Sequence, residues 1–362
     1  MFPSGYASPI VLLRRAMCLI VIMLGGVMPG GVPRRPVTGE ITKGAAVRRN
    51  PAMFAVGILI FAAAGLVGNR SAQPPTAPFT IQRIADGDYA HFGQVAMTTA
   101  QNAGDIANIG IVVGRDAVAV IDTGGSVAVG EALLAAVRTI TDKPVRYVIN
   151  THEHPDHVFG NAAFANPGVT FVGHRDLPAS MRAHGPFYLH SFRDVLGADA
   201  IARVRLIPPT LLVDNTITLD LGGRTLRLTA WSPPAHTDCD LTVLDEQTHT
   251  LFSGDLVFLD HVPVIDGSLK GWLDVLPRLA ALPAERVLPG HGRRIAPWPR
   301  ALDDERRYLL AVEADARRFI ASGSKLAEAV PRIGESERGR WQLFDDYNAR
   351  NATAAFSELE WE

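Results

Sequence analysis

The stretch Val145–His157 reads VRYVINTHEHPDH, an apolar run that leads directly into a dense group of metal-binding side chains. The pattern predicts a buried strand over Val145–Asn150, so the polar group begins at the carboxyl end of that strand. His152 and His154 are two residues apart, and in extended backbone they project to the same side, where they can bind one ion. A metal site is therefore predicted at this strand end.

The residues after Pro155 extend the same group. A proline turns the chain away from the strand, so Asp156 and His157 can approach a second ion beside the first. Three imidazoles and a carboxylate so close in the sequence are costly to bury unless they bind something. Such donors suit zinc, iron, nickel or manganese. Glu153 alternates away from its neighbours and is expected outside the ligand set.

Further ligands are needed, because four side chains cannot complete two metal sites. Three candidates each follow a predicted strand at a glycine or proline turn, namely His236, Asp255 and His291. Each turn is ordinary when taken alone. In this order after the first group, the three residues predict a site for two ions.

Residues 73–323 alternate short apolar runs with amphipathic stretches. Ser126–Thr139 has helical spacing, and Leu211–Leu221 followed by Arg224–Trp231 is typical of a hairpin that turns at two glycines. Strands come in runs with helices between them, which predicts an α/β fold of two mixed sheets packed face to face, with helices outside. Residues 324–362 are expected to form a charged, helical tail.

Residues 1–72 form an N-terminal extension with two apolar runs, Ala16–Val27 and Met53–Val67, each preceded by two arginines. Each run is shorter than the roughly 20 apolar residues of a membrane span and has the basic flank of a signal peptide. Residues 53–72 are therefore predicted to be a signal peptide for periplasmic export, cleaved near Ala72, with no stable membrane insertion afterwards. A retained N-terminal membrane anchor is the alternative.

Charge is unevenly distributed along the chain. The extension carries eight basic residues and one acidic residue, which leaves 27 basic and 36 acidic residues for the remainder. This remainder lacks the basic footprint that nucleic-acid binding requires, so no nucleic-acid partner is expected and the predicted partner is a small-molecule substrate. The two cysteines, Cys18 and Cys239, predict neither a disulfide framework nor a thiolate metal site.

The ordered pattern His-x-His-x-Asp-His, His, Asp, His resembles the dinuclear hydrolases of the metallo-β-lactamase superfamily, with similarity from Phe79 to Ser322. The resemblance implies a four-layer αβ/βα sandwich that holds two zinc ions per chain at one edge, although iron or manganese would also fit. The implied ligands are His152, His154 and His236 for the first ion, Asp156, His157 and His291 for the second, and Asp255 as a bridge. Asp122 resembles the family's structural aspartate, which fixes a ligand histidine from behind.

Shorter segments resemble one exported subgroup, the quinoprotein relay system zinc metallohydrolases, which are related to SoxH-type proteins of sulfur oxidation. These segments are Ile121–Ser126, Ala235–Leu241, Gly254–Phe258, Ile265–Trp272 and Asn348–Asn351 with the ending Glu360–Glu362. The subgroup implies a functional link to a periplasmic quinoprotein dehydrogenase.

Two positions separate the chain from other relatives. Asp255 stands where antibiotic-degrading β-lactamases of the family have a cysteine, and His154 stands where oxygen-reducing di-iron relatives have a glutamate. A hydrolase is therefore favoured. One alternative is an oxidoreductase of sulfur metabolism similar to the mononuclear iron persulfide dioxygenases, against which the full second set of ligands argues. The other is a non-catalytic partner of a quinoprotein dehydrogenase.

The expected reaction is hydrolysis of a small ester, thioester or lactam-like substrate by a hydroxide bridged between two zinc ions. Asp156 is expected to be catalytic as well as a ligand, because its free oxygen could orient the hydroxide and accept its proton. His261, Asp266 and Ser268 lie between two implied ligands, in a loop expected to face the site, and are candidates for substrate binding.

Overall fold

The computed structural model describes residues 79–362, so the predicted signal segment 53–72 and the rest of the extension lie outside the described residues. The following description concerns these residues, all of which lie in the unit Arg70–Glu362. Among residues 79–362, no helix is both long enough and apolar enough to cross a membrane.

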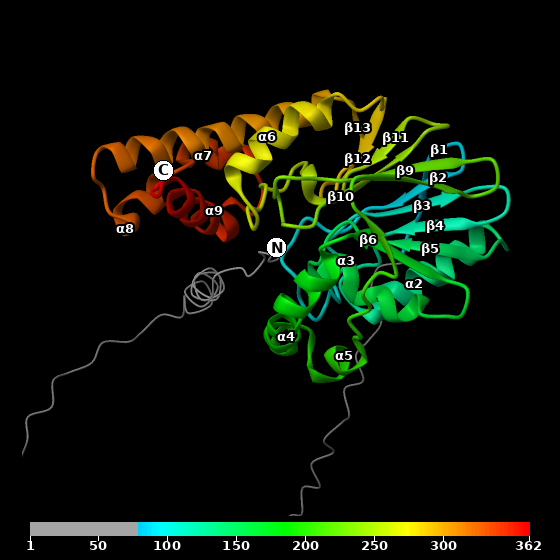
Figure 1. The fold of residues 1–362 in the computed structure, drawn as a ribbon. Helices are drawn as coiled ribbons and strands as arrows, with labels where there is room; N and C mark the ends of the chain where they lie inside the picture. The colour runs from blue at the N-terminus through cyan, green and yellow to red at the C-terminus, as the bar shows by residue number, and fades with distance from the viewer. Residues whose placement is uncertain (1–78) are drawn as a thin grey trace, which may run out of the picture. The chain divides into compact units, whose positions relative to one another are not determined.

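The first sheet has seven strands that follow one another in chain order (Figure 1). Its first four strands pair antiparallel, and the later pairs are parallel. The strands are β1 (Gln82–Ala85), β2 (Asp88–His91), β3 (Ile109–Val113), β4 (Val118–Ile121), β5 (Val145–Ile149), β6 (Thr170–His174) and β7 (Leu211–Val213).

The second sheet has six strands in the order β13, β12, β11, β10, β9, β8. Only β11 and β12 pair parallel within it, so both sheets are mixed, as predicted. The strands are β8 (Thr216–Asp220), β9 (Thr225–Ala230), β10 (Leu241–Asp245), β11 (Thr250–Phe252), β12 (Arg286–Leu288) and β13 (Ala296–Pro297).

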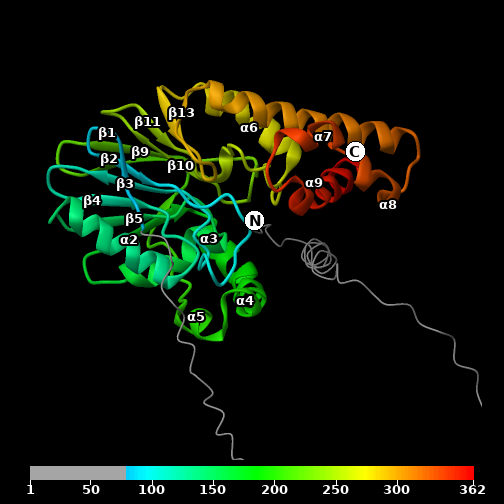
Figure 2. The same ribbon diagram turned by 180° about the vertical axis from the view of Figure 1, so that it is seen from behind.

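Three of the four hydrophobic core clusters in residues 79–362 lie in layers around these sheets, and the fourth lies under α4 (Leu177–Leu196). Buried side chains from both sheets, among them Ile149, Val172, Leu228, Val243 and Phe252, form the central layer. Helix α2 (Val127–Ile140) packs on the first sheet, while α6 (Leu269–Ala280), α7 (Asp303–Ala321) and α9 (Phe344–Leu359) pack on the second (Figures 1 and 2). The α/β class and the face-to-face sheets with outer helices are therefore confirmed.

The remaining helical elements are short, apart from one. They are α3 (Pro155–Val158), η1 (Phe159–Phe164), α4 (Leu177–Leu196), α5 (Ala198–Arg203), η2 (Gly254–Leu256), η3 (Arg300–Leu302), α8 (Leu326–Ala329), η4 (Val330–Arg332) and η5 (Glu335–Arg340). The C-terminal residues contribute to the core, because Trp341, Phe344 and Phe356 are buried with α6 and α7.

The predicted single strand over Leu211–Leu221 is wrong. β7 belongs to the first sheet and β8 to the second, and the chain crosses between the sheets at Asp214 and Asn215. Both residue types favour turns because their side chains hydrogen-bond nearby backbone. The second half of the prediction is confirmed, since β8 and β9 form an antiparallel hairpin.

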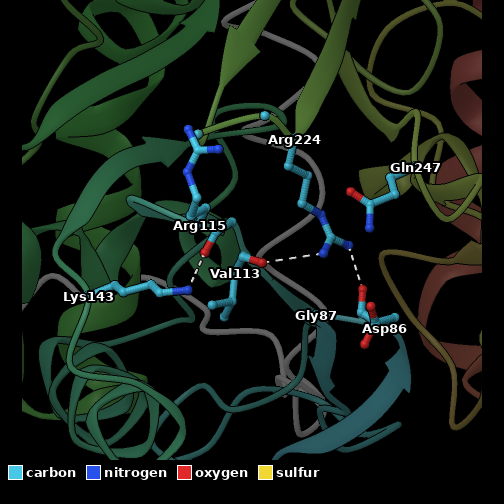
Figure 3. A pocket seen from close by; sticks show the side chains of 10 residues that line it. Asp86, Gly87, Val113, Arg115, Lys143, Arg224 and Gln247 are labelled. Carbon is cyan, nitrogen blue, oxygen red and sulfur yellow. Dashed lines mark hydrogen bonds between the residues drawn. The ribbon is translucent and has the colours of Figure 1, made fainter.

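A buried arginine joins the two sheets. Arg224 donates from its guanidinium to Asp88 of β2 at 2.7 Å and to Asp245 of β10 at 3.1 Å. It also donates to the backbone carbonyls of Asp86, at 2.7 Å, and Val113, at 3.3 Å (Figure 3). Arg224 precedes β9, so this network lies at the opposite end of that strand from the predicted ligand His236.

We expect Arg224→Met to lower the free energy of unfolding by about 3 to 5 kcal/mol, because two buried carboxylates lose their cationic partner. Urea denaturation would measure the change. The control is Arg115→Met, because Arg115 lines the same surface pocket as Arg224 but its side chain is 74% exposed. Its removal should lower the free energy of unfolding by no more than about 0.5 kcal/mol. Equal effects of the two substitutions would contradict this role for Arg224.

Candidate metal centre

The side chains predicted as ligands come from strand ends that meet at one edge of the sandwich. His152, His154, Asp156 and His157 follow β5 of the first sheet. His236 follows β9, Asp255 follows β11 and His291 follows β12, all in the second sheet. Because β11 and β12 are parallel neighbours, their carboxyl ends place Asp255 and His291 side by side.

The first ligand group contains His152, His154, His236 and Asp255, whose candidate ligand atoms lie within 4.8 Å of one another. Nε2 of His236 lies 3.0 Å from Nδ1 of His154 and 3.4 Å from Oδ2 of Asp255. Nε2 of His152 lies 3.9 Å from the same carboxylate oxygen. Three imidazoles and one carboxylate therefore converge on one point.

The second ligand group contains Asp156, His157 and His291. Nε2 of His291 lies 3.3 Å from Oδ2 of Asp156. Asp255 reaches this group too, since its Oδ1 lies 3.2 Å from His157 Nε2 and its Oδ2 lies 3.2 Å from His291 Nε2. One carboxylate thus contacts both groups, which is the arrangement that the family resemblance implied.

Backbone carbonyls fix two of the imidazoles in the form that binds a metal. His236 Nδ1 lies 2.7 Å from the carbonyl oxygen of Val264, and His291 Nδ1 lies 3.0 Å from that of Ile106. A carbonyl can only accept, so Nδ1 of each ring donates and Nε2 keeps its lone pair when the ring is neutral. That lone pair is directed toward the ligand group.

Asp122 fixes a third imidazole and the strand end beside it. Its Oδ2 lies 2.8 Å from His157 Nδ1 and accepts from the Thr151 hydroxyl at 2.7 Å, while its Oδ1 accepts from the Thr151 backbone N–H at 2.8 Å. Asp122 is buried and has φ +61°, a left-handed conformation that non-glycine residues seldom adopt. The structure therefore places Asp122 behind a candidate ligand.

The burial of these groups without other partners fits a cation. His152 Nε2, His157 Nε2 and Asp255 Oδ1 are buried, and among residues 79–362 they have no hydrogen-bond partner. Orphaned buried polar atoms are rare in folded proteins because each loses its hydration without replacement. Imidazole nitrogen and carboxylate oxygen are the donors that zinc prefers. The residues present therefore fit a metal centre.

The pKa values of the histidines are shifted in opposite directions in the two ligand groups. Burial lowers the pKa of His236 to about 3, so this imidazole is neutral near pH 7, as a ligand must be. Burial alone would lower the pKa of His291, but Asp255 and Asp156 raise it to about 9. Burial alone would raise the pKa of Asp255, but His291 and His157 hold it well below its usual range. The second group therefore favours positive charge.

The three candidate substrate residues have different surroundings. Asp266 contacts a group on each side, because its Oδ2 lies 2.9 Å from His154 Nε2 and its Oδ1 forms an ion pair with Arg350. His261 is buried, and its ring lies 5.0 Å from that of His291. The Ser268 hydroxyl accepts from Gly271 N–H at 2.9 Å at the start of α6, so this residue has a capping role.

Glu153 lies away from both ligand groups, as expected. Its carboxylate accepts a hydrogen bond from the Cys239 thiol at 2.9 Å, and its other oxygen lies 3.3 Å from His184 Nδ1. Burial, reinforced by Glu153, raises the pKa of Cys239 well above the usual range. This thiol is packed and protonated.

Sequence reasoning missed the part that α9 plays at the site. Asn351 accepts from the backbone N–H of Ile265 at 2.9 Å and donates to the carbonyl of Pro263 at 2.6 Å. It thereby holds the loop that carries Asp266, with Arg350 beside it. A signal was present, since Asn348–Asn351 was recognised as similar to a subgroup, but the pattern assigned no role to these residues.

Comparisons with known proteins agree with this geometry. The family model "Metallo-beta-lactamase superfamily" matches residues 103–291, more than half of the chain. The chain therefore belongs to the metallo-β-lactamase superfamily.

Curated relatives are enzymes with different substrates. The acyl-coenzyme A thioesterase MBLAC2 of Bos taurus is 28% identical over 216 residues, which cover 52% of this chain and 74% of that protein. The linear primary-alkylsulfatase of a Pseudomonas strain is 45% identical over only 47 residues, 13% of this chain and 9% of that protein.

Solved structures share the fold at low identity. A metallo-β-lactamase from Pontibacter korlensis has a TM-score of 0.52 and 22% identity, over 64% of this chain and 98% of that chain. The sec-alkylsulfatase Pisa1 from Pseudomonas has a TM-score of 0.59 and 14% identity, over 77% of this chain and 50% of that chain.

We expect Asp122→Asn to weaken zinc binding about tenfold to a hundredfold, because an amide would place a donor against the donors of His157 and Thr151. Competition with a chromogenic chelator would measure the affinity. Asp116→Asn is the matched control, since Asp116 precedes the same strand β4 at its other end and is 49% exposed. Unchanged affinity in the Asp122 variant would contradict its role behind His157.

Proposed function

We propose that this protein is a hydrolase that uses two zinc ions to cleave a small ester, thioester or lactam-like substrate. The observation that carries the proposal is the single Asp255 carboxylate in contact with both ligand groups. A shared carboxylate holds two cations close together, and such pairs are typical of hydrolytic metal centres. The thioesterase relatives make a thioester the first substrate class to test.

When bound, two zinc ions would lower the pKa of a shared water from about 15.7 towards 7 and polarise the attacked carbonyl. The protein's own groups do the rest. Asp156 presents Oδ2 to His291 at 3.3 Å, and its Oδ1 is the atom that would accept the proton of the attacking water. Asp266 at His154 and Asp122 at His157 keep these rings oriented throughout.

The second ligand group distinguishes this proposal from a mononuclear iron oxidoreductase. Such an enzyme needs only the first group, whereas here Asp156, His157 and His291 form a second cluster within 4.8 Å. Their burial would be costly without a function for the second position. The proposal therefore requires both groups to be occupied.

We expect protein purified without added metal to contain close to two zinc ions per chain and to hydrolyse the neutral thioester S-pentanoyl-N-acetylcysteamine. Chelation should abolish hydrolysis, and added zinc should restore it. Mass spectrometry of the metals and release of free thiol would measure the two results. A single iron per chain, with oxygen uptake on glutathione persulfide, would overturn the proposal in favour of a dioxygenase.

We expect His157→Ala to reduce thioester hydrolysis at least about a hundredfold while circular dichroism stays unchanged, because the second ligand group loses an imidazole. The matched control is His190→Ala on the exposed side of α4, which should retain full turnover. Full turnover by the His157 variant would sink the dinuclear mechanism.

The proposal places the enzyme in the periplasm, linked functionally to a quinoprotein dehydrogenase. It rests on the basic-flanked apolar run before Ala72 and on the resemblance to an exported subgroup. We expect the mature protein from periplasmic extract to begin close to residue 73 when its first residues are sequenced. A mature chain that begins before Gly65 would show the cleavage zone to be wrong.

A further inference from the structure

One face of α9 spans both ligand groups. Tyr347 and Arg350 are three residues apart in this helix and so lie on the same side of it. The Tyr347 ring lies 5.0 Å from the ring of His261, which in turn lies 5.0 Å from the ligand ring of His291. Arg350 pairs with Asp266, which contacts His154 of the first group. The helix therefore forms a wall of the site.

Hydrogen bonds from two residues of α9 fix the position of this wall. Asn351, next to Arg350, makes hydrogen bonds of 2.9 and 2.6 Å to the backbone of residues 265 and 263. Near the other end of α9, Glu358 accepts from the Leu269 N–H at 2.8 Å at the start of α6. The guanidinium of Arg350 is thus carried on a helix anchored at two points.

Arg350 has more hydrogen-bonding capacity than its surroundings use. A guanidinium has five N–H donors, and among residues 79–362 Asp266 is its one polar partner. The side chain is 27% exposed, and none of its nitrogens is among the buried polar atoms that lack a partner in the described residues. An anion could therefore replace water on the remaining donors in a charge-assisted hydrogen bond.

Tyr188, on α4, is a second polar residue near His154. Its ring lies 6.0 Å from the ring of His154. Burial and the Glu153 carboxylate raise the pKa of Tyr188, and Arg350 opposes that effect. Tyr188 from α4 and Arg350 from α9 therefore both lie near one ligand histidine, Arg350 through Asp266.

We infer that Arg350 and Tyr188 bind a carboxylate of the substrate, so that the enzyme selects acidic thioesters or esters over neutral ones. A carboxylate is the matching anion because its two oxygens fit the planar fork of arginine. The inference rests on the proposed hydrolase function. Tyr188 lies within the family-matched residues 103–291, whereas Arg350 lies beyond them in the C-terminal part of this chain.

The test compares three thioesters with the zinc-loaded enzyme. S-glutaryl-N-acetylcysteamine carries a carboxylate on the acyl side, S-pentanoyl-3-mercaptopropionate carries one on the leaving group, and S-pentanoyl-N-acetylcysteamine is neutral. We expect Arg350→Gln to lower kcat/KM about tenfold to a hundredfold for one acidic thioester and less than twofold for the neutral one. The affected substrate identifies which side carries the carboxylate.

Two further variants test whether Arg350 binds the substrate carboxylate or only supports Asp266. Arg350→Lys keeps the charge but not the fork and should fall between wild type and Arg350→Gln on the affected substrate. Arg318→Gln, an exposed arginine on α7, should leave all three thioesters unchanged. An equal loss on all three substrates in Arg350→Gln would show that Arg350 only supports Asp266, and would overturn the inference.

A binding measurement keeps the inference testable without turnover. Glutarate is titrated calorimetrically into zinc-loaded wild type and Arg350→Gln, with zinc content measured for both. Binding at least tenfold weaker in the variant supports the carboxylate site, and equal binding overturns it. If zinc is bound and glutarate is distinguished but no thioester is cleaved, the hydrolase proposal fails and the carboxylate site stands.

Discussion

The Asp255 carboxylate, buried between two groups of imidazoles, is the interaction on which the site depends. Its two oxygens lie 3.2 to 3.9 Å from nitrogens of four histidines that come from both sheets. Such a concentration of donors is unstable in a protein interior unless a cation and an outer layer of hydrogen bonds compensate it. The two sheets pack face to face, so their strand ends bring the donors together, and neighbouring loops supply the outer layer of hydrogen bonds.

The ligand residues could be predicted because the information is local. A strand followed by a polar turn is visible in the sequence, and His152, His236 and His291 each follow this rule. Their outer partners could not be predicted in the same way. The carbonyls of Val264 and Ile106 serve as acceptors, and a backbone carbonyl has no residue-specific signature. The sequence does not predict helix α4 either. It forms despite the internal Pro186, because tertiary packing buries one of its faces.

The C-terminal helices matter more to the site than their charged composition indicates. Glu305 of α7 accepts from the N–H of Phe258 at 2.7 Å, close behind Asp255, and burial raises the pKa of this carboxyl well above its usual range. Asn351 of α9 holds the next loop. The loop between Asp255 and α6 therefore has hydrogen bonds to two helices that follow the last ligand in the chain. Contacts so distant in sequence leave no periodic pattern. Residues 324–362, which include α9, are therefore predicted only as a charged, helical tail.

Metal ligands and the proposed substrate-binding groups lie on different elements, which explains how one kind of metal centre can serve enzymes with different substrates. The family-matched residues 103–291 include every candidate ligand, and the curated proteins similar to this chain include a thioesterase and, over 47 residues, an alkylsulfatase. Metal ligands set the chemistry of attack, whereas discrimination depends on groups that touch the rest of the substrate. Here those groups lie on α4, inserted between two ligand-bearing segments, and on α9, after the last of them. Because neither helix supplies a ligand, substitutions there can change which substrate fits without removing a donor from the metal centre.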